Sequence, residues 1–201
     1  KISYSDALLK YGTDKPDLRN PLIINDITEI FTREDVSFDI FKKLVKNGSQ
    51  VRCIVTKNTK DKPRSFFDGI DKWAKEQGAS GLAYFTFEND KDLSAKGPIG
   101  KFFSKESLLE IMKKTNSKVG DSIFMACGKQ SDLEKITALA RDKIANELDL
   151  IDENIFAFCW VIDYPMFEKD EVTKKIEFSH NPFSMPQGEI DQINFDKPLE
   201  I

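Results

Sequence analysis

The sequence predicts an α+β fold in which helices pack on a sheet. Between residues 50 and 148, short stretches with strand periodicity alternate with longer stretches of helical periodicity. The resulting order, strand–helix repeated three times, suits helices packed on one sheet. Hydrophobic residues make up 40% of the 201 residues and charged residues 32%, which is typical of a packed domain and not of a disordered chain.

The N-terminal part is expected to begin with a helix over residues 3–11, which Gly12 ends. Residues 14–17 are expected to form a turn, because Asp and Pro both favour one. Residues 24–32 show no clear periodicity and are expected to be an irregular or weakly helical link.

Three strand–helix pairs follow. The expected strands are residues 50–56, 82–87 and 121–127. The expected helices are residues 65–77, 104–115 and 131–148, with Ser65, Ser104 and Ser131 or Asp132 as candidate N-caps.

The C-terminal part is less regular. Residues 156–162 are almost wholly apolar, which predicts a buried strand. Residues 169–175 read as a charged hairpin tip, after which residues 176–178 pair back. An extended polar loop is expected over residues 179–188.

Composition excludes several classes of function. The net charge of −4 and the pI of about 5.2 give no strong basic field that would demand nucleic acid. Cys53, Cys127 and Cys159 lie far apart among apolar residues, which favours buried free thiols in a reducing, cytosolic compartment over a metal site or a disulfide. No apolar run approaches the length of a membrane span, and no signal peptide is visible.

Two sharply punctuated polar segments carry the candidate chemistry. They are residues 11–21, which read YGTDKPDLRNP, and residues 179–186, which read SHNPFSMP. Both are rich in groups that could bind an anionic small molecule. The charges of residues 14–19 are equally explained as a solvated loop whose side chains pair with one another, and Asp163 is either a turn cap or a site residue.

His180 is the only histidine and directly follows an expected strand end. Loops after strands are where binding residues gather, and an imidazole can donate a hydrogen bond to a carboxylate. His180 is therefore either a structural side chain or a ligand-binding one. No phosphate-binding loop, zinc-spaced cysteine pair, metal site or dinucleotide fingerprint occurs, and no catalytic residue is assigned.

Four passages together resemble a known family: YGTDKPDLR at residues 11–19, GLAY at 81–84, FCWVIDYPMF at 158–167 and HNPFS at 180–184. The chain resembles bacterial-type aspartyl-tRNA synthetase, a class II enzyme. The resemblance implies an inserted GAD domain at residues 33–149, with an antiparallel sheet and helices on one face. It implies that residues 1–32 and 150–201 are strips of the catalytic domain.

The resemblance also implies a function for the full-length parent. That enzyme would activate L-aspartate with ATP and Mg²⁺ and transfer it to tRNA(Asp), as a cytoplasmic homodimer. By the same resemblance, His180 would bind L-aspartate. Many relatives have a second histidine where Asn181 stands, which makes tRNA(Asn) a further expected substrate.

The class II signature motifs, which supply most contacts to ATP, are absent from these 201 residues. The fragment alone is therefore expected to need no cofactor and to catalyse nothing, with the ATP-site residues outside it. Two alternatives stay open, a stand-alone GAD-like module that binds tRNA or a partner, and a generic α+β interaction domain. Neither alternative explains why the chain contains the two polar segments.

Overall fold

The structure is a computed structural model of residues 1–201, and it describes all of them except 90, 171–172, 180–184, 187–190 and 192. Its contacts divide the chain into two compact units. The larger unit is Asp6–Phe158, and the smaller one combines Lys1–Ser5 with Cys159–Ile201. The expected boundaries at residues 33 and 149 stay a prediction.

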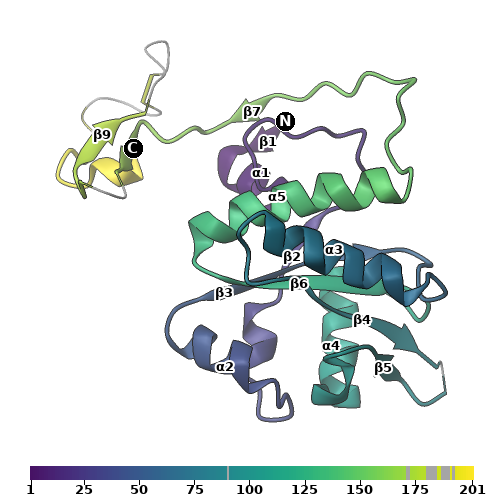
Figure 1. Ribbon diagram of the computed structural model, residues 1–201. Helices are drawn as coiled ribbons and strands as arrows, with labels where there is room; N and C mark the ends of the chain where they lie inside the picture. The colour runs from purple at the N-terminus through teal and green to yellow at the C-terminus, as the bar shows by residue number, and fades with distance from the viewer. Residues whose placement is uncertain (90, 171–172, 180–184, 187–190, 192) are drawn as a thin grey trace. The chain divides into compact units, whose positions relative to one another are not determined.

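A five-stranded antiparallel sheet forms the centre of the larger unit, in the order β2–β3–β6–β4–β5 (Figure 1). The strands are β2 (Ile24–Asp26), β3 (Gln50–Thr56), β4 (Ala83–Glu88), β5 (Ser94–Lys96) and β6 (Ser122–Gly128). The longest pairing joins β3 to β6, from Gln50 opposite Gly128 to Thr56 opposite Ser122. The expected α+β class and antiparallel sheet are confirmed.

Helices cover both faces of this sheet, whereas the resemblance implied helices on one face only. On one face lie α3 (Arg64–Glu76) and α5 (Gln130–Glu147). On the other lie the 3-10 helix η1 (Thr28–Thr32), α2 (Asp39–Lys46) and α4 (Lys105–Thr115).

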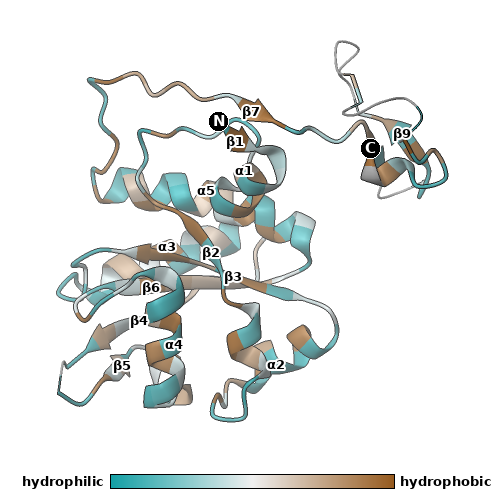
Figure 2. Cartoon of the chain, turned by 180° about the vertical axis from the view of Figure 1, so that it is seen from behind, coloured by the Kyte–Doolittle hydropathy of each residue, from teal (hydrophilic) through white to brown (hydrophobic). Residues whose placement is uncertain are grey.

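The physical reason lies in the strands, because both of their faces are apolar. Along β3, Val51 and Cys53 pack with the side chains of α2 and α4, while Ile54 packs with those of α3 and α5. Successive side chains of a strand point to opposite faces of the sheet. Because those on both faces are buried here, the sheet needs a layer of helices on each face. Figure 2 shows the matching pattern in α2 and α4, which carry both hydrophobic and hydrophilic residues.

The periodic elements were predicted well. A helix at Tyr4–Tyr11 (α1), the three strands β3, β4 and β6, and the helices α3, α4 and α5 are all present within one or two residues of expectation. Ser104 caps α4 as expected, because its Oγ accepts a hydrogen bond of 3.0 Å from the backbone N–H of Ser107. The expected cap at Ser65 is wrong, since α3 starts one residue earlier, after Pro63.

Several short elements of the described chain were missed, among them β2, β5 and α2. Residues 24–32, expected to be a link, instead form an edge strand and then the 3-10 helix η1. Gly97, directly after the edge strand β5, lies against the backbone of β4. Its φ is +145°, and a Cβ there would lie 2.9 Å from the carbonyl oxygen of Tyr84, so this turn requires glycine.

The smaller unit is built from short pairings. Strand β1 (Ile2–Ser3) runs parallel to β7 (Val161–Ile162), and β8 (Phe167–Lys169) pairs antiparallel with β9 (Ile176–Phe178), followed by the 3-10 helix η4 (Pro198–Glu200). The hairpin between β8 and β9 confirms the expected one. The buried strand expected over residues 156–162 is wrong for most of its length, because only Val161–Ile162 is a strand and Phe156, Phe158 and Trp160 are exposed.

The cysteines are free thiols, as predicted, but only Cys53 is buried, whereas Cys127 and Cys159 are half-buried. Burial raises the pKa of the Cys53 thiol far above its ordinary value and that of Cys127 to about 11. Both groups are therefore protonated and inert at neutral pH. Of the helices that the structure describes, none is both long and apolar enough to cross a membrane.

Candidate functional site

The first polar segment, residues 11–21, lies on helix α5 of the larger unit. The contact begins at Gly12, whose φ is +72° and which sits directly against the helix backbone. A Cβ at this position would lie 2.5 Å from the carbonyl oxygen of Glu134 and 2.8 Å from the Cβ of Ala138. Only glycine allows so close an approach.

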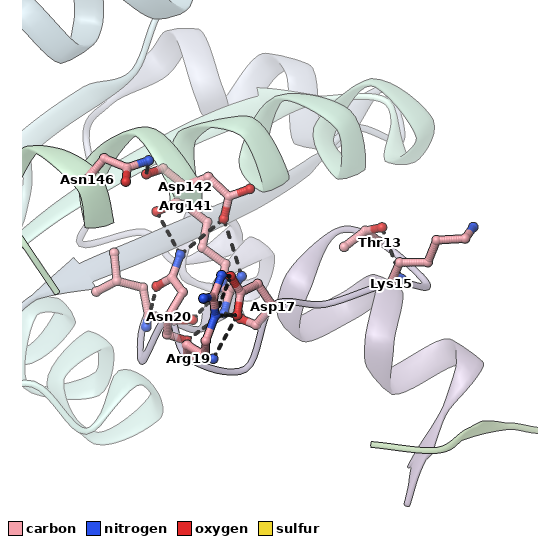
Figure 3. A network of polar contacts seen from close by, with 9 residues as sticks. Thr13, Lys15, Asp17, Arg19, Asn20, Arg141, Asp142 and Asn146 are labelled. Carbon is pink, nitrogen blue, oxygen red and sulfur yellow. Dashed lines mark hydrogen bonds and ion pairs between the residues drawn. The ribbon is translucent and has the colours of Figure 1, made fainter. Parts of the chain in front are cut away.

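Arg141 of α5 holds the rest of the segment, although it is a charged residue that is only 1% exposed. Its Nε donates to the carbonyl of Leu22 at 2.6 Å, and its Nη2 donates to the carbonyls of Asp17 at 2.8 Å and Asn20 at 2.7 Å (Figure 3). Its guanidinium carbon also lies 5.0 Å from the ring centroid of Tyr11. Burial lowers the pKa of this guanidinium, and the carbonyl oxygens supply the compensation that a buried charge needs.

Asn20 closes the same network from the side of the segment (Figure 3). Its side-chain amide donates to the carbonyl of Arg141 at 3.2 Å and to Oδ1 of Asp142 at 3.1 Å. Its Oδ1 accepts from the backbone N–H of Leu22 at 3.0 Å. The segment and α5 are thus joined through backbone groups as well as side chains, which fixes the path of residues 17–22.

The charged side chains of this segment pair with one another. The Nζ of Lys15 lies 3.1 Å from Oδ2 of Asp14, and the Nη2 of Arg19 lies 2.7 Å from Oδ2 of Asp17. Hydrogen bonds from Arg19 hold the pKa of the Asp17 carboxyl below its ordinary range. Of the two explanations open from the sequence, the self-paired loop accounts for these charges as they stand.

The second polar segment belongs to the smaller unit. His180, the expected aspartate-binding residue, and residues 181–184 lie outside the described residues. The beginning of the segment is placed, since the backbone N–H of Ser179 donates to the carbonyl of Met166 at 2.9 Å. Met185 and Pro186, at its other end, line a cavity of about 900 Å³.

This cavity brings together both ends of the smaller unit. Its walls include Ser5, which precedes the larger unit in sequence, and the turn after β7 that contains Asp163 and Tyr164. Asp163 has a φ of +59°, a left-handed conformation that Asp tolerates better than most residues. The cavity combines a carboxylate with apolar walls, and a cavity of this size can hold a small molecule.

The described residues contain no group of three or more His, Cys, Asp or Glu side chains that could hold a metal ion. The residue that holds the first polar segment in place, Arg141, was missed by sequence reasoning. Its signal was present, because Arg141 lies between Thr137 and Ile144 on the apolar stripe of the predicted helix. A charged residue on such a stripe predicts a buried, fully bonded side chain.

Comparisons with known proteins match both the centre of the chain and its flanks. The GAD domain family matches residues 41–137. Over all 201 residues the chain is 74% identical to a protein of Pelagibacter ubique named Aspartate–tRNA(Asp/Asn) ligase, of which it covers 34%. It is 46% identical to the protein of that name from Beijerinckia indica and 50% identical to one from a Wolbachia of Drosophila simulans, again over the whole chain and about a third of each relative.

The chain therefore spans about a third of the length of these relatives. The similarity includes both polar segments and is not confined to the central domain. It confirms the resemblance that the four sequence passages carried. The chain is thus similar along its whole length to proteins named aspartate–tRNA ligases, and its residues 41–137 match the GAD domain family.

Proposed function

We propose that this chain is part of an aspartate–tRNA ligase, which activates L-aspartate with ATP and transfers the aspartyl group to tRNA. The observation that carries the proposal is the 74% identity over the whole chain to a protein of that name. The stand-alone GAD-like module is not favoured, because the similarity extends to both flanks of the matched residues 41–137. We retain residues 33–149 as the insertion, with catalytic strips at 1–32 and 150–201.

The proposed substrates include both tRNA(Asp) and tRNA(Asn). The relatives are named as ligases for both. The resemblance also implies that Asn181 stands where many members of the family carry a second histidine. The other properties that the resemblance implied, a cytoplasmic homodimer that uses Mg²⁺ with ATP, belong to the same proposal.

The residues that the structure describes do not fit Mg²⁺. No cluster of carboxylates or histidines suited to a metal occurs among them. We propose that the ATP site lies in the part of the synthetase outside this chain. By itself the 201-residue chain is expected to catalyse nothing.

Aspartate-dependent exchange of pyrophosphate into ATP, measured on the complete protein, tests the activity. Charging of tRNA(Asp) and tRNA(Asn) transcripts at matched concentrations tests the second substrate. Exchange without aspartate dependence would contradict the proposal as a whole. Charging of tRNA(Asp) alone would contradict only the dual specificity.

His180 is proposed to bind the aspartate substrate. In the complete protein, His180→Ala is expected to raise the KM for aspartate about tenfold or more, the usual cost of one lost hydrogen bond to a charged group. The KM for ATP and the thermal midpoint should change little. Lys175→Ala, an exposed substitution at the tip of the β8–β9 hairpin, is the matched control. An unchanged KM for aspartate in the histidine variant would remove His180 from the site.

A further inference from the structure

A second cavity, of about 430 Å³, lies in the larger unit at the edge of the sheet. Its floor consists of the buried side chains of Phe67, Tyr84 and Thr86. Its rim carries four cationic side chains from the loop after β3, the start of α3 and the end of β5: Lys60, Lys62, Arg64 and Lys96. No Asp or Glu is among the described residues that line it.

Three of these four cations have no carboxylate partner among the described residues, and one of them, Lys62, lies 5.9 Å from the ring centroid of Phe66. The structure gives Lys60, Lys62 and Lys96 no ion pair with any described residue. Arg64 differs, because its Nε lies 3.1 Å from Oδ2 of Asp68. Since the whole chain has a net charge of −4, the positive charge of this rim is a local feature. Like charges around one cavity repel each other until an anion enters.

The start of α3 adds to the positive potential. Its N-cap position is Pro63, whose side chain has no acceptor that could bind the first N–H groups of the helix. The 13 residues of Arg64–Glu76 make a helix long enough for a partial positive charge at its N-terminus. An uncapped N-terminus beside lysines is an arrangement that suits phosphate.

The floor of the cavity is held rigidly. The ring of Phe67 stacks on that of Tyr84, with the centroids 5.0 Å apart. The Tyr84 hydroxyl donates to Oδ1 of Asp68 at 2.6 Å, so the carboxylate that pairs with Arg64 is itself fixed. The glycine turn at Gly97 keeps the end of β5, and with it Lys96, against β4. The exposed cationic side chains therefore extend from a preformed wall, which lowers the cost of binding.

We propose that this cavity binds phosphate groups of an RNA backbone through Lys60, Lys62 and Lys96. The choice of RNA over another phosphate source rests on the proposed function, since the relatives are ligases for tRNA. Lysine is a point charge with three donors, which suits phosphate contacts that carry no sequence information. An acidic peptide would instead favour arginine, whose planar fork matches carboxylates, and the only arginine here already holds one.

The test measures binding of a labelled tRNA transcript to the 201-residue chain by fluorescence anisotropy, across a series of salt concentrations. The variant is Lys60→Ala/Lys62→Ala/Lys96→Ala. Arg64 is left intact, because its loss would also release Asp68. The control, Lys43→Ala/Lys46→Ala/Lys113→Ala, removes three exposed lysines from α2 and α4 on the other face of the sheet and so changes the net charge equally.

The rim variant is expected to bind RNA on the order of tenfold more weakly at 0.1 M salt and to reduce the slope of log K against log salt by about 2 to 3. The control should keep both values close to those of the parent. An equal loss in both variants would overturn the proposal, because binding would then be general electrostatics.

Two competitors distinguish other sources of the anion. Inorganic phosphate that displaces RNA at submillimolar concentration would overturn the RNA assignment in favour of a small anion. Polyglutamate that binds as tightly as RNA, with the same loss in the rim variant, would overturn it in favour of an acidic peptide. Failure of the proposed ligase function is seen separately, in the exchange assay on the complete protein, which does not depend on this binding.

Discussion

The buried anchor at Arg141 gives the sharpest prediction about stability. Replacing it with methionine keeps a long side chain in the space but removes every donor. Three carbonyl oxygens, those of Asp17, Asn20 and Leu22, then lose their partner. The carbonyls of Leu22 and Asn20 are buried, and each costs about 1–2 kcal/mol when left without a hydrogen bond, whereas the part-buried carbonyl of Asp17 costs less. Relief from burying a charge returns part of the sum. The expected loss in the free energy of unfolding is about 3 kcal/mol.

Urea denaturation of the 201-residue chain, followed by tryptophan fluorescence and circular dichroism, measures this loss. A domain of ordinary stability has only 5–15 kcal/mol in total, so the midpoint should fall by roughly 1–2 M urea. Lys135→Met is the control, because Lys135 is exposed on the same helix and the change has the same chemistry. Arg141→Lys should fall between the two, since lysine keeps the charge but not the planar set of donors.

A local readout separates the anchor from a general packing effect. Because Arg141 fixes the path of residues 17–22, trypsin should cleave after Arg19 faster in Arg141→Met than in the parent under native conditions. Two results would refute the reasoning. One is a change in unfolding free energy below about 0.5 kcal/mol, the range of ordinary surface substitutions. The other is an equal loss in the Lys135 control.

Two further predictions concern folding and pH. An excised piece of residues 33–149 should be less stable to urea than one of residues 6–158, because it lacks β2 and the buried Ile24, Ile27, Ile30 and Phe31. Equal midpoints for the two pieces would show that the upstream residues are dispensable. Asp35 accepts hydrogen bonds from Arg33 and Ser104, which together lower its pKa from 3.8 to about 2. Since the folded pKa lies below the unfolded one, this stabilisation is full above about pH 4 and is lost as the pH falls towards 2. Asp35→Asn should therefore flatten the fall of Tm between pH 4 and pH 2, and an unchanged profile would contradict this account.

Local patterns sufficed for the long elements of the fold. The helices α3, α4 and α5 each show apolar residues at helical spacing, and β3, β4 and β6 are apolar strands of six or seven residues. The three-residue edge strands β2 and β5 carry no such pattern. They exist because β3 and β4 offer them hydrogen-bonding partners, and this is information that resides elsewhere in the chain.

In the candidate sites too, local features were predictable from the sequence and long-range contacts were not. The polar segments were recognisable from their punctuation, and the resemblance of the chain was readable from four short passages. The partners of Arg141 could not be predicted, since they lie 119–124 residues away in sequence. Likewise, the basic rim joins residues 60–64 to Lys96 only after β4 and β5 have paired. The net charge of the chain did not indicate this basic rim, because an acidic chain can still carry a local cluster of lysines.

The error over residues 156–162 is the most informative one. Phe156, Phe158 and Trp160 are 89%, 91% and 76% exposed, although their sequence has the composition of a buried strand. Isolated exposed apolar residues are common, but three large aromatic side chains on alternate positions of one extended segment are not. The apolar composition of a segment reflects the environment that it occupies in the folded protein. A strand also needs neighbouring strands with which it can pair. The relatives are about three times as long as this chain. Under the proposed function, we expect strands from outside these 201 residues to cover this segment. The sequence pattern would then predict the structure of the longer protein more faithfully than that of this chain alone.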